Sequence, residues 1–252
     1  MNIRLLALAT LLLFASCQAP APGILTIAAA ANVQFVIEEL GETFTEETGI
    51  PTEVILSSSG KLTAQILEGA PYDLFISANM KYPERLHSAG KTLLPPKIYA
   101  YGKLVLWTQD PDLQPDMQAL KLPETDFIAL ANPKTAPYGY AAAEALKHYQ
   151  LIESLRQKLV YGESISQTNQ FITTRSARIG FTAKSVVLSP VMKDKGRWVE
   201  VDTASYSPIA QGVVPLQRKD GNTEAAEQFY HFLLGEKAQK ILQTYGYQPV
   251  AQ

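Results

Sequence analysis

The sequence predicts an α/β protein of two lobes, each with a mixed, mainly parallel sheet flanked by helices. Short apolar runs alternate with segments of helical periodicity, and this alternation occurs once in each half of the chain. Two longer apolar runs could pass from one half to the other, which predicts two crossovers. The last two helical segments are expected to pack back on the first unit.

The first unit consists of three predicted strands separated by two predicted helices. Apolar runs at 24–30, 52–56 and 73–77 predict the strands, and helical spacing at 33–44 and 62–67 predicts helices that glycines end. This order implies parallel strands with right-handed crossovers. Ligands of such sheets bind beyond the carboxyl ends of the strands.

The second unit repeats this order without visible sequence repetition. Apolar runs at 127–131, 159–161 and 178–182 predict strands, and helices are expected to begin at Tyr138 and Ile165.

Four further segments connect the two units. The expected crossover strands are 99–107 and 209–216, and the expected final helices are 223–234 and 236–245. The predicted lobes comprise 24–105 with 206–252, and 106–205, with a ligand cleft between them.

The N-terminal segment resembles an export signal. Residues 5–14 carry no charge over a length that is too short for a membrane span but typical of secretory signals. Phe14-Ala15-Ser16-Cys17 resembles the end of a bacterial lipoprotein signal, in which cleavage leaves a lipidated cysteine. We expect a signal peptide at 1–17, a tether at 18–23, and an exported protein that is periplasmic or membrane-anchored through Cys17. The alternative is a simple secretory signal from which Cys17 is discarded.

Composition excludes several classes of protein. The chain has 252 residues, of which 46% are hydrophobic, enough for one large core or two medium ones. The net charge of −2 offers no basic surplus for nucleic acid. A single cysteine excludes an intrachain disulfide.

Polar residues follow three of the predicted strands. Asn32, Ser59 and Tyr138 each lie where a strand gives way to a helix. Helix starts present unpaired backbone N–H groups and the positive end of the helix dipole, both of which favour an anion. Three such starts predict a site for a small oxyanion. The alternative is that Asn32 and Ser59 are ordinary N-caps and Tyr138 a packed aromatic residue.

Five spaced segments carry a resemblance to a known family. They are Leu25–Asn32, Ser57–Gly60, Gly69–Ala78, Asn132–Tyr140 and Glu163–Ile165. Together, and in this order, they resemble the molybdate-binding proteins of ABC importers, which belong to the two-lobed bacterial solute-binding proteins with the type II periplasmic-binding-protein fold. The resemblance extends over essentially the whole chain after the signal.

The resemblance implies a set of ligand-binding residues. Asn32 would donate from its side chain, its backbone or both, and Ala31 lies beside it in the same motif. Ser59 would donate through its hydroxyl and its N–H. Tyr138 and Ile165 would donate backbone N–H groups.

One position departs from the family. Some members place a ligand-binding tyrosine shortly after the Gly180 strand, where this chain has Ala183. The Tyr138 hydroxyl is therefore a candidate side-chain ligand.

The resemblance also implies the function. We expect the binding component of an ABC importer, a monomer that takes molybdate or tungstate into the cleft through neutral donors and meets a membrane permease. No cofactor, nucleic acid or catalysis is expected. Molybdenum would be bound as the oxyanion, without direct metal ligands.

Two alternatives remain at this point. The ligand could be another oxyanion such as sulfate or phosphate. Molybdate, tungstate and sulfate share charge and shape, so only the size of the site separates them. More distantly, Ser58 and Lys61 match the S-x-x-K pattern of serine acyl-enzymes, although the S-D-N and K-T-G motifs of that class are absent.

Overall fold

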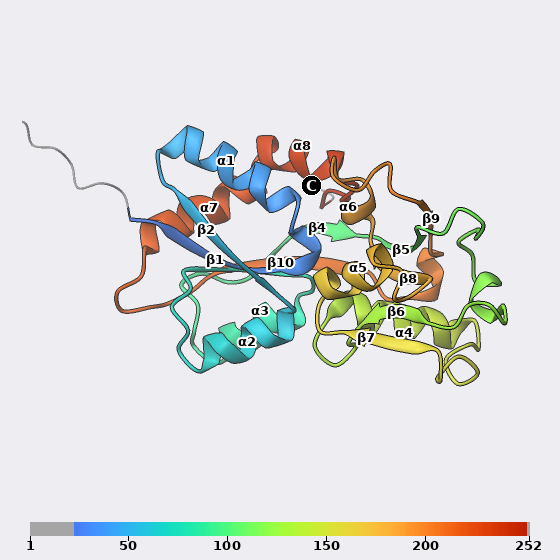
Figure 1. Ribbon diagram of the computed structural model, residues 1–252. Coiled ribbons are helices and arrows are strands. Elements are labelled where there is room, and N and C mark those ends of the chain that lie inside the picture. Colours follow the sequence, from blue (N-terminus) through green and yellow to red (C-terminus); the bar gives the residue numbers. More distant parts are fainter. Residues whose placement is uncertain (1–22, 251–252) are drawn as a thin grey trace, which may run out of the picture.

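Two five-stranded sheets form the framework of the protein. Their strand orders are β2-β1-β3-β10-β4 and β7-β6-β8-β5-β9. In each sheet four strands run in the same direction, and one strand, β10 in the first sheet and β5 in the second, runs antiparallel to them. The computed structural model describes residues 23–250, and Cys17 with the expected leader lies outside them. The two sheets and their helices form two lobes that lie side by side (Figure 1).

The elements follow the predicted alternation. Those of the first lobe are β1 (Leu25–Ala30), η1 (Ala31–Val33), α1 (Val36–Thr48), β2 (Thr52–Ser57), α2 (Ser59–Leu67), β3 (Leu74–Ser77), α3 (Lys81–Ser88), β4 (Lys97–Gly102), β10 (Ile209–Pro215), α7 (Thr223–Leu234) and α8 (Glu236–Thr244). Those of the second are β5 (Leu104–Thr108), η2 (Ala119–Lys121), β6 (Ile128–Ala131), α4 (Pro137–His148), β7 (Leu159–Gly162), α5 (Ile165–Thr173), β8 (Ile179–Ala183), α6 (Lys184–Val187), β9 (Arg197–Glu200) and η3 (Thr203–Ser205).

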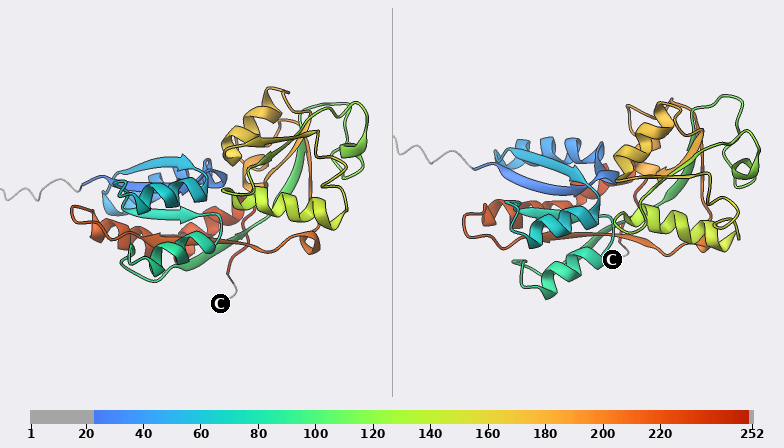
Figure 2. Two further views of the ribbon diagram at one scale, coloured as in Figure 1. Left: turned by 90° about the horizontal axis from the view of Figure 1, so that it is seen from below. Right: turned by 60° about the horizontal axis from the view of Figure 1, so that its bottom comes forward.

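Helices cover both faces of the first sheet (Figure 2). Leu25 and Ile27 of β1 pack with α1, α7 and α8, whereas Ala28 packs with α2 and α3 on the other face. A strand covered on both faces has to be apolar throughout, which explains the continuous run Leu25–Ala30. The return of the last two helices to the first lobe agrees with the prediction.

The expected strand at 99–107 is two strands that belong to different sheets. β4 pairs with β10, and β5 pairs with β8 and β9 after a break at Lys103. The expected boundary between residues 105 and 106 falls inside β5, whose residues pair in the second sheet from Leu104 onward. The chain has to leave one sheet before it can pair in the other.

Besides the short 3-10 helices, α3, α6 and β9 were not predicted. α3 buries only Tyr82, Pro83 and Leu86, α6 has only four residues, and β9 is largely exposed. None of the three carries the long apolar pattern on which the other predictions rest.

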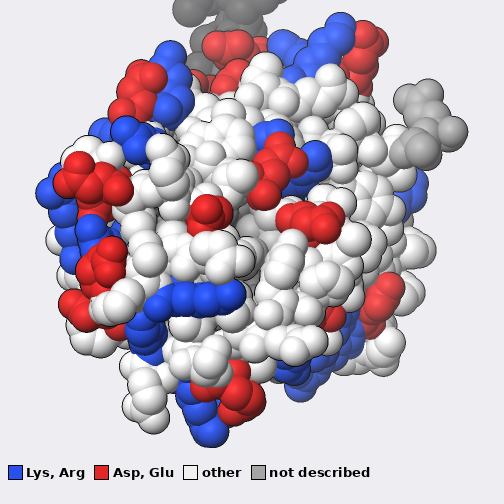
Figure 3. All heavy atoms as spheres, turned by 90° about the vertical axis from the view of Figure 1, so that its right-hand side faces the viewer, with Lys and Arg blue, Asp and Glu red and all other residues white. Residues whose placement is uncertain are grey.

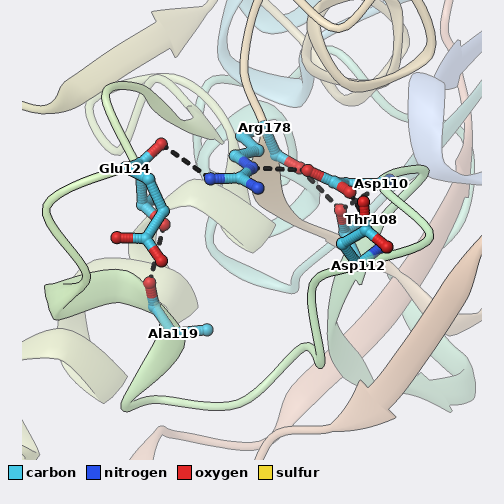
Figure 4. A network of polar contacts seen from close by, with 7 residues as sticks. Thr108, Asp110, Asp112, Ala119, Glu124 and Arg178 are labelled. Carbon is cyan, nitrogen blue, oxygen red and sulfur yellow. Dashed lines mark hydrogen bonds and ion pairs between the residues drawn. The ribbon is translucent and has the colours of Figure 1, made fainter.

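Arg178 anchors the segment between β5 and β6 to the second sheet (Figure 4). Its guanidinium forms an ion pair with Asp110 and donates to the Glu124 carbonyl at 2.9 Å. Thr108 Oγ1 donates to the Arg178 carbonyl at 2.6 Å and accepts from the Asp110 N–H at 3.0 Å. This network ties the segment after β5 to the start of β8.

Charged side chains of both signs are interspersed on the outer face of the second lobe (Figure 3). This face therefore offers no broad basic surface of the kind that attracts nucleic acid. Within residues 23–250, no helix combines the length and the apolar character needed to cross a membrane.

Candidate functional site

A small cavity lies between the lobes, where β1, β2 and β6 end. Its volume is about 10 Å³, far below the roughly 300–1,000 Å³ of sites for drug-sized ligands. Its lining consists of Ala30, Ala31, Asn32, Ser58, Ser59, Ala78, Ala136, Pro137, Tyr138 and Ile165. The five residues expected from the sequence are all among them. A wider hollow between α1 and α7 lies on the outside of the first lobe, but its lining includes Glu47, Glu224, Glu227 and Glu236, whose carboxylates disfavour an anion.

Three helices begin at this cavity. They are α2 at Ser59, α4 at Pro137 and α5 at Ile165. N–H groups in the first turn of a helix have no acceptor within it, and the dipole makes this end positive. No side chain caps α2 or α4, and the Ser164 side chain caps a later N–H of α5. Pro137 has no N–H, so Tyr138 is the first donor of α4. These three starts suit an anion.

The Ser59 hydroxyl is oriented by its own lobe. Its Oγ accepts a hydrogen bond from the Ala78 N–H at 3.0 Å, and the residue is completely buried. This contact occupies one lone pair and leaves the hydroxyl hydrogen available. Ser59 can therefore present two donors, its hydroxyl and its N–H.

The side-chain amide of Asn32 forms hydrogen bonds with other residues of the protein. Its Nδ2 donates to Gln211 Oε1 at 2.8 Å and to the Tyr247 hydroxyl at 2.9 Å. Both amide hydrogens are thus used, which leaves the backbone N–H as the donor that Asn32 can offer to a ligand. Asn32 is also tied to the second lobe, because Ser185 Oγ donates to its carbonyl at 2.8 Å.

The Tyr138 hydroxyl lies at the crossover strands. It lies beside the Asn32 amide, and a Cβ added to Gly102 would be 2.0 Å from it. Burial raises the pKa of Tyr138 well above its usual value, and the nearby Tyr247 and Tyr99 add to the shift. The hydroxyl therefore stays neutral.

No charged side chain lines the cavity. An ion pair joins Lys61 of α2, two residues after Ser59, to Glu163, two residues before Ile165. The Lys61 amino group therefore has a partner other than Ser58, whose hydroxyl makes no hydrogen bond with any described residue. This geometry leaves Ser58 without the activating base that an acyl-enzyme needs. Residues 23–250 also hold no cluster of three or more His, Cys, Asp or Glu suited to a metal ion.

Four polar residues at or beside the cavity were not predicted for this site. They are Ser58, which borders it, and Gln211, Tyr247 and Ser185, which hold Asn32. Ser58 lies in a run of three serines, of which the motif indicated only one. Gln211 is a polar residue in an apolar strand, which is a usable signal. Nothing local marks Tyr247 or Ser185.

Comparison with known proteins gives consistent matches along the chain. A family model described as Bacterial extracellular solute-binding protein matches residues 25–248. The molybdate-binding protein ModA of Rhodobacter capsulatus is 38% identical over 229 residues, which are 90% of this chain and 89% of the relative. ModA of Azotobacter vinelandii is 36% identical over 223 residues, which are 88% of each chain.

The fold agrees with these relatives. The solved structure of the Azotobacter vinelandii periplasmic molybdate-binding protein matches with a TM-score of 0.84 at 33% identity, covering 90% of this chain and 100% of that one. The predicted two-lobed α/β fold is thereby confirmed. These relatives are binding proteins rather than enzymes, as the sequence predicted for this chain. The chain belongs to the bacterial extracellular solute-binding protein family, in which it is a ModA-like member.

Proposed function

We propose that this protein is the extracytoplasmic binding component of an ABC importer and that it binds molybdate and tungstate in the cavity between its lobes. One observation carries the proposal: uncapped helix starts from both lobes converge on a buried cavity whose lining has no charge. The molybdate-binding names of the two ModA relatives support the choice of anion.

Neutral donors are sufficient for such a ligand. The proposed donors are the backbone N–H groups at Ala31 and Asn32, both donors of Ser59, and the N–H groups of Tyr138 and Ile165. Each charge-assisted bond to a tetrahedral dianion contributes on the order of 1.5–3 kcal/mol. The lining contains no Lys or Arg, so no buried cation has to be desolvated before the anion binds.

The Tyr138 hydroxyl has a different proposed task. It lies against Gly102 and beside the Asn32 amide, and neither the Tyr138 hydroxyl nor Asn32 Oδ1 has a hydrogen-bond partner among the described residues. We assign it to holding the Asn32 loop, while the Tyr138 backbone N–H serves the ligand.

Closure of the two lobes over the anion forms the second part of the proposal. Contacts between lobes surround the cavity: the Gly60 N–H donates to the Thr135 carbonyl at 2.9 Å, and Ser185 binds Asn32. The two lobes, between which the chain passes at Lys103, would move against each other, and the ligand would shift this equilibrium toward the closed form.

The remaining proposals concern the protein's surroundings. The chain would be exported as a monomer, either free in the periplasm or tethered through a lipidated Cys17, and would pass its anion to a membrane permease. The lipoprotein-like signal and the membership in an extracellular family support this placement.

Titration calorimetry with four anions tests the choice of ligand. We expect molybdate and tungstate to bind at micromolar or tighter affinity, at least roughly a hundredfold (~2.7 kcal/mol) better than sulfate or phosphate. Comparable isotherms for sulfate and molybdate would instead identify a receptor for another oxyanion.

A further inference from the structure

Ser58 occupies the N-cap position of α2 but does not act as a cap. Its backbone is extended, with φ −74° and ψ 148°, as expected for an N-cap residue. A serine there usually accepts a hydrogen bond from an N–H of the first turn. The Ser58 side chain makes no such bond, so the usual reason for a serine at this position is missing.

The Ser58 hydroxyl is buried without a partner. The residue is 3% exposed, and its Oγ makes no hydrogen bond within residues 23–250. Buried hydroxyls are normally paired, because leaving one unpaired destabilises the folded state. The adjacent Ser59 differs, since its Oγ is bonded to the Ala78 N–H.

The environment of this hydroxyl points to the cavity. Ser58 is one of its lining residues, and the other first-lobe residues that line it include Ala30 and Ala78, whose methyl groups offer no acceptor. An anion bound beside the Ser59 N–H would lie at the start of α2, next to the Ser58 side chain. A hydroxyl can turn its hydrogen toward such an acceptor.

We propose that Ser58 is a further ligand-binding residue, whose hydroxyl donates to an oxyanion oxygen from the first lobe. This inference rests on the proposed function of the same cavity. It adds a side-chain donor to the backbone groups and to Ser59. It also gives the Ser58 side chain a role other than capping α2, in which it makes no hydrogen bond.

The test compares Ser58→Ala with Ser57→Ala, a matched change one residue earlier that lies outside the cavity lining. Each variant and the wild type are titrated with molybdate, tungstate, sulfate and phosphate. For the anion that the wild type binds best, we expect Ser58→Ala to lose roughly tenfold to a hundredfold in affinity. Ser57→Ala should remain within twofold of the wild type.

Thermal unfolding without ligand separates binding from a structural role. Because the Ser58 hydroxyl makes no bond within its own lobe, Ser58→Ala should unfold at the wild-type temperature or slightly above it. A lower unfolding temperature with unchanged affinity would overturn the proposal in favour of capping. Equal affinities of Ser58→Ala and Ser57→Ala would overturn it while leaving the proposed function intact. A wild type that binds none of the four anions would overturn both.

Discussion

Lys61 of the first lobe and Glu163 of the second form an ion pair immediately outside the cavity. Lys61 lies two residues after Ser59, and Glu163 lies two residues before Ile165, so each charge is adjacent to a proposed donor of its own lobe. The two side chains are 45% and 56% exposed, and such pairs contribute about 0–1 kcal/mol. The pair can therefore bias lobe closure only modestly.

Charge reversal tests whether this pair acts as a latch, that is, whether it stabilises the closed arrangement of the two lobes. Lys61→Glu or Glu163→Lys alone should speed molybdate release roughly two- to tenfold, because repulsion replaces attraction across the cleft. The double variant should restore the slow release, as measured by stopped-flow competition. The matched control is Lys237–Glu47, a similarly exposed pair within the first lobe, whose reversal should leave release unchanged. If Glu163→Lys instead tightens binding, attraction between the added positive charge and the anion outweighs the ion pair, and the latch is excluded.

Ser59→Ala should weaken molybdate binding by roughly ten- to two-hundredfold, because one charge-assisted bond in a buried site is lost. The Ala78 N–H would also lose its acceptor, so the variant should be slightly less stable while remaining folded. Lys61→Ala should change affinity far less in the same calorimetric titration. An acyl-enzyme would show the reverse order of importance, with Lys61 indispensable.

Gly102→Ala should impair closure. The added Cβ would lie 2.0 Å from the Tyr138 hydroxyl and 2.9 Å from Gln211 Nε2. We expect weaker molybdate binding and, in solution scattering, a larger radius of gyration at saturating ligand. Adding Tyr138→Phe removes the closer atom and should recover part of the affinity relative to Gly102→Ala, with Tyr138→Phe alone as the control. A double variant no better than Gly102→Ala would show that this contact does not limit closure.

Asp110 should make the stability of the second lobe depend on pH. The hydrogen bond from Arg178, together with the Asp112 N–H, lowers the pKa of Asp110. A carboxyl whose folded pKa is lowered stabilises the fold above its unfolded pKa of about 3.9 and loses this contribution as pH falls through the folded value. Asp110→Asn should therefore lower the unfolding temperature near pH 6, and its difference from the wild type should shrink below about pH 4. Glu153→Asn, an exposed site without an ion pair in the described chain, should show no such trend. A difference that stays constant across this range would exclude the Asp110–Arg178 pair as its source.

Cys17→Ala should release the protein from the membrane fraction without changing its anion affinity, since the first strand begins only at Leu25. Fractionation followed by N-terminal sequencing checks this. A soluble wild type whose first residue is not Cys17 would indicate an ordinary secretory signal.

The order of strands and helices could be predicted from the sequence because it follows from local patterns. The apolar run Leu25–Ala30 and the helical spacing from Val33 to Phe44 needed no distant partner to be recognised. Pairing between sheets has no such local pattern. The break at Lys103, which sends β4 and β5 to different sheets, became visible only once their partners were in place.

The candidate site, too, could be predicted only in part from the sequence. Ser59 and Tyr138 could be predicted as anion-binding residues because each lies where a predicted strand gives way to a helix. Unpaired N–H groups are a local property of every helix start. The use of the Asn32 amide could not be predicted in this way, since its partners Gln211 and Tyr247 lie 179 and 215 residues further along the chain. Such contacts depend on how the packed lobes bring distant side chains together, and only the tertiary structure determines that.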